Sequence, residues 1–145
     1  MKTLIIFSPG KYPNNMNYAL VLLRVAVGLL MLTHGVGKLS AIFADGPIQF
    51  PDPIGIGAAA SLTLAVFAEF FCSILLIFGL GTRLAAVTLL INMLVAAIIV
   101  HANDGFGKQE LPLLYASIYF VIVVVGAGKI SIDNWIYKKI KRRLN

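Results

Sequence analysis

The feature that most constrains this chain is a series of four long apolar blocks. Short polar segments separate these blocks, which are residues 17–39, 57–80, 84–101 and 111–128. Crossing the hydrocarbon layer takes about 20 mostly apolar residues in a helix, and lipid admits only helices or closed barrels. Of the 145 residues 59% are hydrophobic and 12% charged, unlike a soluble domain. We therefore expect an all-α fold, a single integral membrane domain built as a four-helix bundle.

The distribution of cations predicts the orientation of these spans. Four spans place both tails and the turn at 81–83 on one side of the membrane. That side carries nine of the twelve cations, namely Lys2, Lys11, Arg83, Lys129, Lys138, Lys139, Lys141, Arg142 and Arg143. Because cations are retained on the cytoplasmic side, both termini should be cytoplasmic, and the loops 40–56 and 102–110 should face outward.

The two tails of the chain read as membrane-surface segments. The C-terminal NWIYKKIKRRLN places Trp135 and two isoleucines among cations, which predicts a short amphipathic helix on an anionic leaflet, with membrane lipid as its partner. No recognition domain accompanies this charge, so nucleic acid is not an expected partner. The early run TLIIF, residues 3–7, is too short for a signal peptide, and we expect the first sixteen residues to lie on the membrane surface.

The cysteine count excludes one class of membrane enzyme. Cys72 is the single cysteine, and it lies inside the second block. The chain can form neither an intramolecular disulfide nor a CxxC pair. It is therefore not a membrane thiol oxidoreductase that carries its own dithiol.

The first block contains charges that lipid resists. At about 100° per residue one face of its helix gathers a polar and small-residue stripe, which is Arg24, Gly28, Met31, His34, Gly35 and Lys38. A cation near the bilayer centre costs roughly 2.5 to 3.5 kcal/mol, so this stripe should face the bundle interior. Arg24 lies about 22 Å from the outer end of the first helix, and Glu69 about 18 Å into the second. We therefore predict an Arg24–Glu69 ion pair in the core, completed by Asn92, with either a structural or a functional role.

A second polar group is expected nearer the outer surface. It comprises His34, Lys38, His101, Glu110 and Tyr115, which could converge on one ligand-binding pocket. A quinone headgroup, whose carbonyls need a His or Tyr donor in an apolar slot, suits this chemistry. A haem is disfavoured because His101 is expected about a turn above His34, and the absence of an HxxxH or HExxH spacing predicts no metal site. The sequence does not indicate which of these residues are catalytic.

Taken in order, these motifs resemble the DoxX family of small bacterial membrane proteins. The resemblance covers nearly the whole chain. In the first two spans it rests on the pattern R-x3-G-x5-HG-x2-KL from Arg24 to Leu39 and on Glu69. Farther along it rests on GLGTR before the third span, H-x3-GF at His101, Glu110 with the following LPLLY, and GAGKISID at 126–133. It implies a four-helix bundle in the bacterial inner membrane.

The resemblance also implies a functional association. Members of the family are linked to respiratory or quinone-dependent oxidoreductases, and the family is named after a subunit of an archaeal quinol oxidase. Our first hypothesis is a membrane subunit or partner of a quinone-linked oxidoreductase. The alternatives are a non-enzymatic scaffold or assembly factor, as relatives in the wider superfamily resemble, and a proton or solute pathway along Arg24, Glu69 and His34. An oxidoreductase subunit and further copies of the chain are the expected protein partners.

Overall fold

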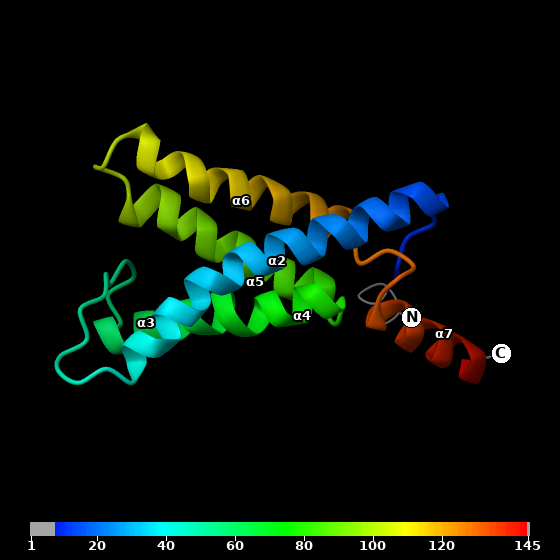
Figure 1. Cartoon of the computed structure of the whole chain (residues 1–145), viewed down its shortest axis with the longest axis horizontal. Helices are drawn as coiled ribbons and strands as arrows, with labels where there is room; N and C mark the ends of the chain where they lie inside the picture. The colour runs from blue at the N-terminus through cyan, green and yellow to red at the C-terminus, as the bar shows by residue number, and fades with distance from the viewer. Residues whose placement is uncertain (1–7, 145) are drawn as a thin grey trace.

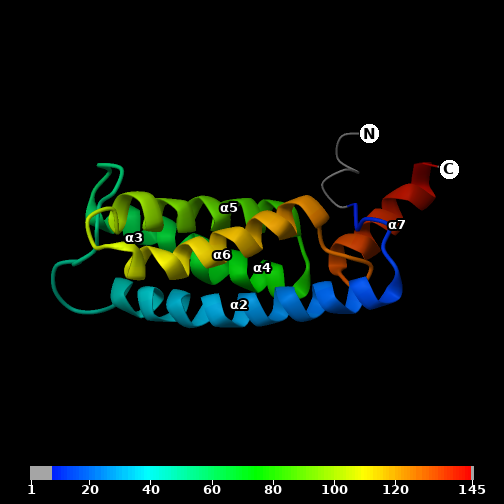
Figure 2. The ribbon, with the colours of Figure 1, turned by 90° about the horizontal axis from the view of Figure 1, so that it is seen from above.

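The computed structural model describes residues 8–144, and its regular elements are helices throughout that range. Four rods form the bundle, and α7 follows as a shorter helix (Figures 1 and 2). The first rod is α2 (Asn14–Ile42), the second is α3 (Ala58–Val66), η1 (Phe67–Cys72) and α4 (Ser73–Phe78), the third is α5 (Thr82–Val95) and η2 (Ala96–Val100), and the fourth is α6 (Phe106–Val125). Helix α7 spans Ile132–Leu144.

The rods are arranged as two packed pairs. Helix α2 packs along α3, η1 and α4, whereas α5 packs mainly against α6. Toward the end of the bundle that carries the loops 43–57 and 101–105, which we call the loop end, α2 and α6 diverge (Figure 1). At the opposite end, the tail end, the segment 126–131 lies against the first turns of α2, and the turn at 79–81 lies near Arg24. Both ends of the described chain lie at the tail end.

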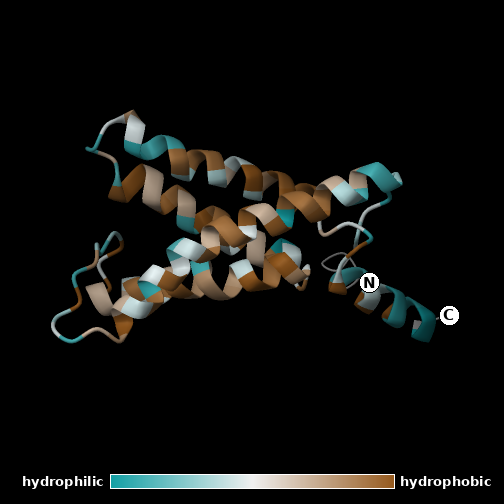
Figure 3. Ribbon diagram, in the orientation of Figure 1, coloured by the Kyte–Doolittle hydropathy of each residue, from teal (hydrophilic) through white to brown (hydrophobic). Residues whose placement is uncertain are grey.

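The outer surface of the bundle is apolar. All four rods are long and hydrophobic enough to cross a membrane. Large apolar side chains such as Leu22, Phe71, Ile98 and Val124 are exposed on it. In Figure 3 hydrophobic residues, drawn brown, recur along the ribbons of all four rods, and α7 is mostly hydrophilic. Surfaces of this kind require lipid rather than water. The expectation of an all-α membrane bundle is confirmed.

The helix boundaries differ from those expected by a few residues. Helix α2 extends three residues beyond the expected 17–39 at each end, and α6 begins at Phe106, five residues before the expected Leu111. Polar residues 108–110 and Pro112 suggested a later start. Pro112 is the seventh residue of α6 and lies inside the helix, where its missing N–H leaves the carbonyl of Lys108 without its usual helical donor.

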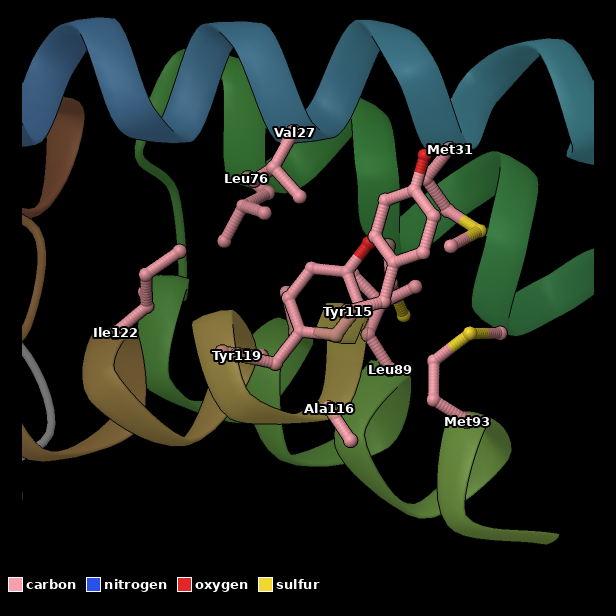
Figure 4. Packing of buried hydrophobic residues seen from close by; sticks show 12 residues of the cluster. Val27, Met31, Leu76, Leu89, Met93, Tyr115, Ala116, Tyr119 and Ile122 are labelled. Atoms are coloured by element: carbon pink, nitrogen blue, oxygen red, sulfur yellow. The ribbon is translucent and has the colours of Figure 1, made fainter. Parts of the chain in front are cut away.

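The core is formed by residues from all four rods. Tyr115 and Tyr119 of α6 stack at 6.0 Å between ring centroids and point their hydroxyl groups toward α2 (Figure 4). Around them lies an apolar cluster that includes Val27, Met31, Cys72, Leu76, Leu89 and Ile122. This cluster fills the bundle between the loop end and the tail end.

Gly28 and Gly35, the two glycines on the predicted stripe, allow close approach of α2 to the second rod, and Gly37 lies outside that stripe. A Cβ atom on Gly35 would lie 2.6 Å from the carbonyl carbon and oxygen of Glu69, whereas one on Gly37 would meet nothing within 4 Å. The backbone of η1 cannot move aside as a flexible side chain can. The contact therefore requires glycine at position 35 and not at position 37.

This contrast predicts opposite effects of the same substitution. Gly35→Ala should lower the free energy of unfolding by about 1–3 kcal/mol, because the added methyl group forces α2 away from η1. Gly37→Ala should be neutral or stabilising by up to about 1 kcal/mol, since alanine favours the helix. Thermal unfolding of both variants in the same mild detergent checks the difference. Equal melting temperatures would contradict the close packing at Gly35.

Candidate functional site

Arg24 is buried at the tail end of the bundle. Its side chain is 1% exposed, and its guanidinium donates hydrogen bonds to the carbonyl of Ile130 at 2.7 Å and to that of Leu76 at 3.4 Å. Arg24 thus joins α2 to the end of α4 and to the segment before α7. The predicted Arg24–Glu69 ion pair is wrong, because the partners of Glu69 come from elsewhere.

The register between α2 and the second rod explains this error. Gly35 lies against the backbone of Glu69, so Arg24 is eleven residues, or about 16 Å, farther along α2. The expected match in depth between Arg24 and Glu69 was calculated from helix ends at residues 39 and 57. Helix α2 in fact continues to Ile42, which shifts Glu69 toward the loop end relative to Arg24.

Asp133 is a second tail-end residue, and the sequence analysis did not single it out. Its carboxylate is 1% exposed and accepts hydrogen bonds from the backbone N–H groups of Gly81 at 2.7 Å and Thr82 at 2.9 Å. A carboxylate is favourable at this position, where α5 begins, because the first N–H groups of a helix lack partners within it. The GAGKISID motif contained the signal, namely an acidic residue in an otherwise basic segment.

Glu69 lies in the interior near the loop end and has two partners. Its carboxylate forms an ion pair with Lys38 Nζ, and Asn92 Nδ2 donates to its Oε1 at 2.9 Å. The side chain of Glu69 is only 4% exposed, and that of Lys38 is 29% exposed. The expected hydrogen bond from Asn92 is therefore present, but the cation beside the carboxylate is Lys38.

Both helices beside this network contain a π-helical turn. Glu69 lies within η1, and η2 begins four residues after Asn92. Such turns add one residue to a helical turn and often occur at functional sites, where they redirect a side chain. Nothing in the local sequence predicts them.

The larger of two cavities around Glu69 is mostly apolar. It has a volume of about 540 Å³, within the usual range for ligand pockets. Its lining includes Lys38, Glu69 and Asn92 together with Phe50, Pro51, Leu64, Phe67, Ile91, Val95 and His101. Leu64, Phe67 and Ile91 are exposed on the surface of the bundle, so this cavity reaches the side that faces lipid.

The smaller cavity contains most of the predicted pocket residues. It has a volume of about 190 Å³, and its lining includes His34, Lys38, His101 and Tyr115. The His34 and Tyr115 rings meet edge to face at 6.4 Å between centroids. Four of the five predicted residues therefore lie together, and their role in ligand binding stays a prediction.

Glu110 is the exception, because it is exposed and does not line this cavity. It lies five residues before Tyr115 on α6, which places it about 140° away around the helix. Lys108 lies seven residues before Tyr115 and on the same face, and it does line the cavity. Lys108 therefore takes the place that the sequence analysis gave to Glu110.

His101 is held at the edge of both cavities. Its Nδ1 lies 2.7 Å from Asp104 Oδ2, and this hydrogen bond, together with nearby Lys108, holds the pKa of the Asp104 carboxyl below its usual range. Both histidines border the smaller cavity, whose volume is below the roughly 300–1,000 Å³ usual for ligand pockets, and the absence of a haem stays a prediction. Residues 8–144 contain no group of three or more His, Cys, Asp or Glu that could hold a metal ion.

Comparison with known proteins identifies the family. The DoxX family profile matches residues 19–102, more than half of the chain. The chain belongs to the DoxX family. No solved structure matches it.

Several relatives of the chain are bacterial membrane proteins or proteins without a described function. It is 35% identical to an uncharacterized protein of Haemophilus influenzae, with 84% of this chain and 93% of the relative covered. It is 28% identical to a Bacillus subtilis protein named "Putative oxidoreductase CatD", covering 81% and 87%, and 27% identical to the Escherichia coli inner membrane protein YqjF, covering 80% and 90%. The DoxX-family chain is thus a membrane protein, in keeping with the bacterial inner membrane.

Proposed function

We propose that this DoxX-family protein is the membrane subunit or partner of a quinone-linked oxidoreductase and that it binds the quinone headgroup in the larger cavity. The observation that carries this proposal is the position of Lys38, Glu69 and Asn92 on the wall of an apolar cavity that reaches the lipid-facing surface. A quinone travels within the bilayer and needs such a lateral entrance. The Bacillus subtilis relative named as an oxidoreductase lends further support.

The polar wall offers both kinds of hydrogen bond that this ligand needs. Lys38 has three N–H donors, of which one points to Glu69, and a quinone carbonyl accepts such a bond. The Glu69 carboxylate and the carboxamide oxygen of Asn92 can accept from the hydroxyl groups of a hydroquinone. The apolar remainder of the cavity suits the ring and the start of the isoprenoid chain.

Filling the cavity should strongly reduce copurification of quinone. Thr88 lines the larger cavity and is half-buried, so Thr88→Phe adds a ring there without changing charge. Thr63 is exposed and, like Thr88, bonds its hydroxyl to the carbonyl four residues earlier, but it lines none of the cavities around Lys38. We expect about tenfold less quinone per protein in Thr88→Phe, a change of about 1.4 kcal/mol, and no loss in Thr63→Phe.

The measurement is mass spectrometry of lipids extracted from protein purified in mild detergent. Wild-type protein should carry quinone, and Asn92→Leu should retain several-fold less because it loses a polar partner of the headgroup. A preparation that contains no quinone but a stoichiometric protein partner would overturn the proposal in favour of a non-enzymatic scaffold.

A further inference from the structure

The two cavities share one wall, and Glu69 is part of it. Lys38, Glu69, Ala96 and His101 line both of them. The larger cavity reaches lipid, whereas the smaller one is lined by Lys108, His34 and His101, which are exposed or partly exposed at the loop end. The carboxylate of Glu69 therefore stands between an apolar ligand cavity and a polar space near the aqueous surface.

The other side of Glu69 is closed. Toward the tail end the core is mostly apolar and includes Val27, Leu76, Leu89 and Ile122, which are all at most 3% exposed. The buried hydroxyl groups of Ser73, Thr82 and Tyr119 have no hydrogen-bond partner among the described residues, so they do not form a chain of hydrogen bonds from Glu69 toward that end. Arg24, the next buried charge, bonds to carbonyl groups at the tail end.

We propose that Glu69 exchanges protons with the solution at the loop end only, through the smaller cavity. The titratable groups that line this route are Lys38 and His34 of α2, His101 after η2, and Lys108 and Tyr115 of α6. Imidazole, ammonium and phenol groups, with water between them, can pass a proton from the carboxyl group to the surface.

This inference rests on the proposed function, because the chemistry of the quinone supplies the protons that the route carries. Oxidation of a hydroquinone to a quinone breaks two O–H bonds and removes two electrons, which pass singly to a haem or iron–sulfur centre of the partner oxidoreductase. Each of the two protons passes to a carboxylate oxygen of Glu69 and then to water in the smaller cavity. Both protons leave on one side of the membrane, and the cation distribution predicts that this side is the outer one.

Single cysteines test the route without any redox reaction. Cys72 is the chain's only cysteine, so Cys72→Ala gives a cysteine-free background. Tyr115 and Met93 line the smaller cavity, whereas Tyr119, one turn deeper than Tyr115 on the same face, lines none of the cavities around Lys38. With a charged, membrane-impermeant thiosulfonate reagent, Tyr115→Cys and Met93→Cys should be labelled from the loop side, at least about tenfold faster than Tyr119→Cys.

Intact spheroplasts and inside-out vesicles distinguish the two sides. Labelling of Tyr115→Cys and Met93→Cys should occur from one side only, the side from which Asn103→Cys in the exposed loop 101–105 is labelled. Ile98→Cys, on the lipid-facing surface, should remain unreactive. Labelling rates are compared only among cysteine variants that elute at the same volume as the wild type in gel filtration.

Equal protection of Tyr115→Cys, Met93→Cys and Tyr119→Cys would overturn the route, as would labelling of the first two from the tail side. This result is independent of the quinone assay. Water access without copurified quinone would overturn the proposed function and leave the proton route. Copurified quinone without water access would overturn the proton route and leave the proposed function.

Discussion

Replacing Arg24 by methionine should lower the free energy of unfolding by about 3–5 kcal/mol, the largest effect that we expect from one substitution. Methionine has a similar length but no donors. It leaves the carbonyl groups of Ile130 and Leu76 without the guanidinium at a buried position, and it removes the cation near buried Asp133. Steric trapping of the unfolded state in bicelles measures this loss.

Arg24→Lys is the control for the charge alone. Lysine keeps the cation but has no planar fork, and it cannot reach both carbonyl groups as arginine does. We expect it to retain part of the stability and to lie between the wild type and Arg24→Met. If both variants matched the wild type within error, Arg24 would not be joining α2 to the segment before α7.

Replacing Lys38 by methionine should cost about 1–3 kcal/mol, the second largest effect. The change leaves the nearly buried carboxylate of Glu69 with Asn92 as its remaining polar partner. The loss is smaller than at Arg24 because the Lys38 side chain is 29% exposed, and water already screens part of its attraction. Thermal unfolding in detergent at neutral pH checks it.

Lys108→Met is the matched control for that substitution. Lys108 also lines the smaller cavity, but its side chain is 66% exposed and its carboxylate partner is Asp104 at the surface. We expect its melting temperature to stay close to that of the wild type, because exposed ion pairs contribute little. Similar losses in Lys38→Met and Lys108→Met would mean that burial of Glu69 is not what makes Lys38 important.

The sequence predicted the architecture because lipid allows few solutions for long apolar blocks. It also predicted that His34, Lys38, His101 and Tyr115 meet, since their positions follow from helical periodicity and from the ends of neighbouring spans. The partner of Glu69 was missed because depth was counted from expected helix ends at 39 and 57, whereas the register of the packed helices places Gly35, and not Arg24, beside Glu69. A lysine side chain leans toward the N-terminus of its helix, so Lys38 reaches Glu69 from about one turn beyond Gly35.

Two other features could not be read from sequence patterns. The π-helical turns at η1 and η2 depend on packing between helices and leave no local signal. The role of Asp133 depends on a chain reversal that brings residue 133 back to the start of α5, fifty-two residues from Gly81. Contacts over such separations arise from the whole fold, and helical periodicity describes only one element at a time.

A pair of double-mutant cycles tests most directly the claim that two separate ionic networks hold this bundle. The cycles combine Glu69→Gln with Lys38→Met and Glu69→Gln with Arg24→Met, each measured as the free energy of unfolding in bicelles. We predict a coupling energy of about 1 kcal/mol or more for Lys38 and Glu69, and additivity within about 0.5 kcal/mol for Arg24 and Glu69. Strong coupling between Arg24 and Glu69, with none between Lys38 and Glu69, would contradict the account.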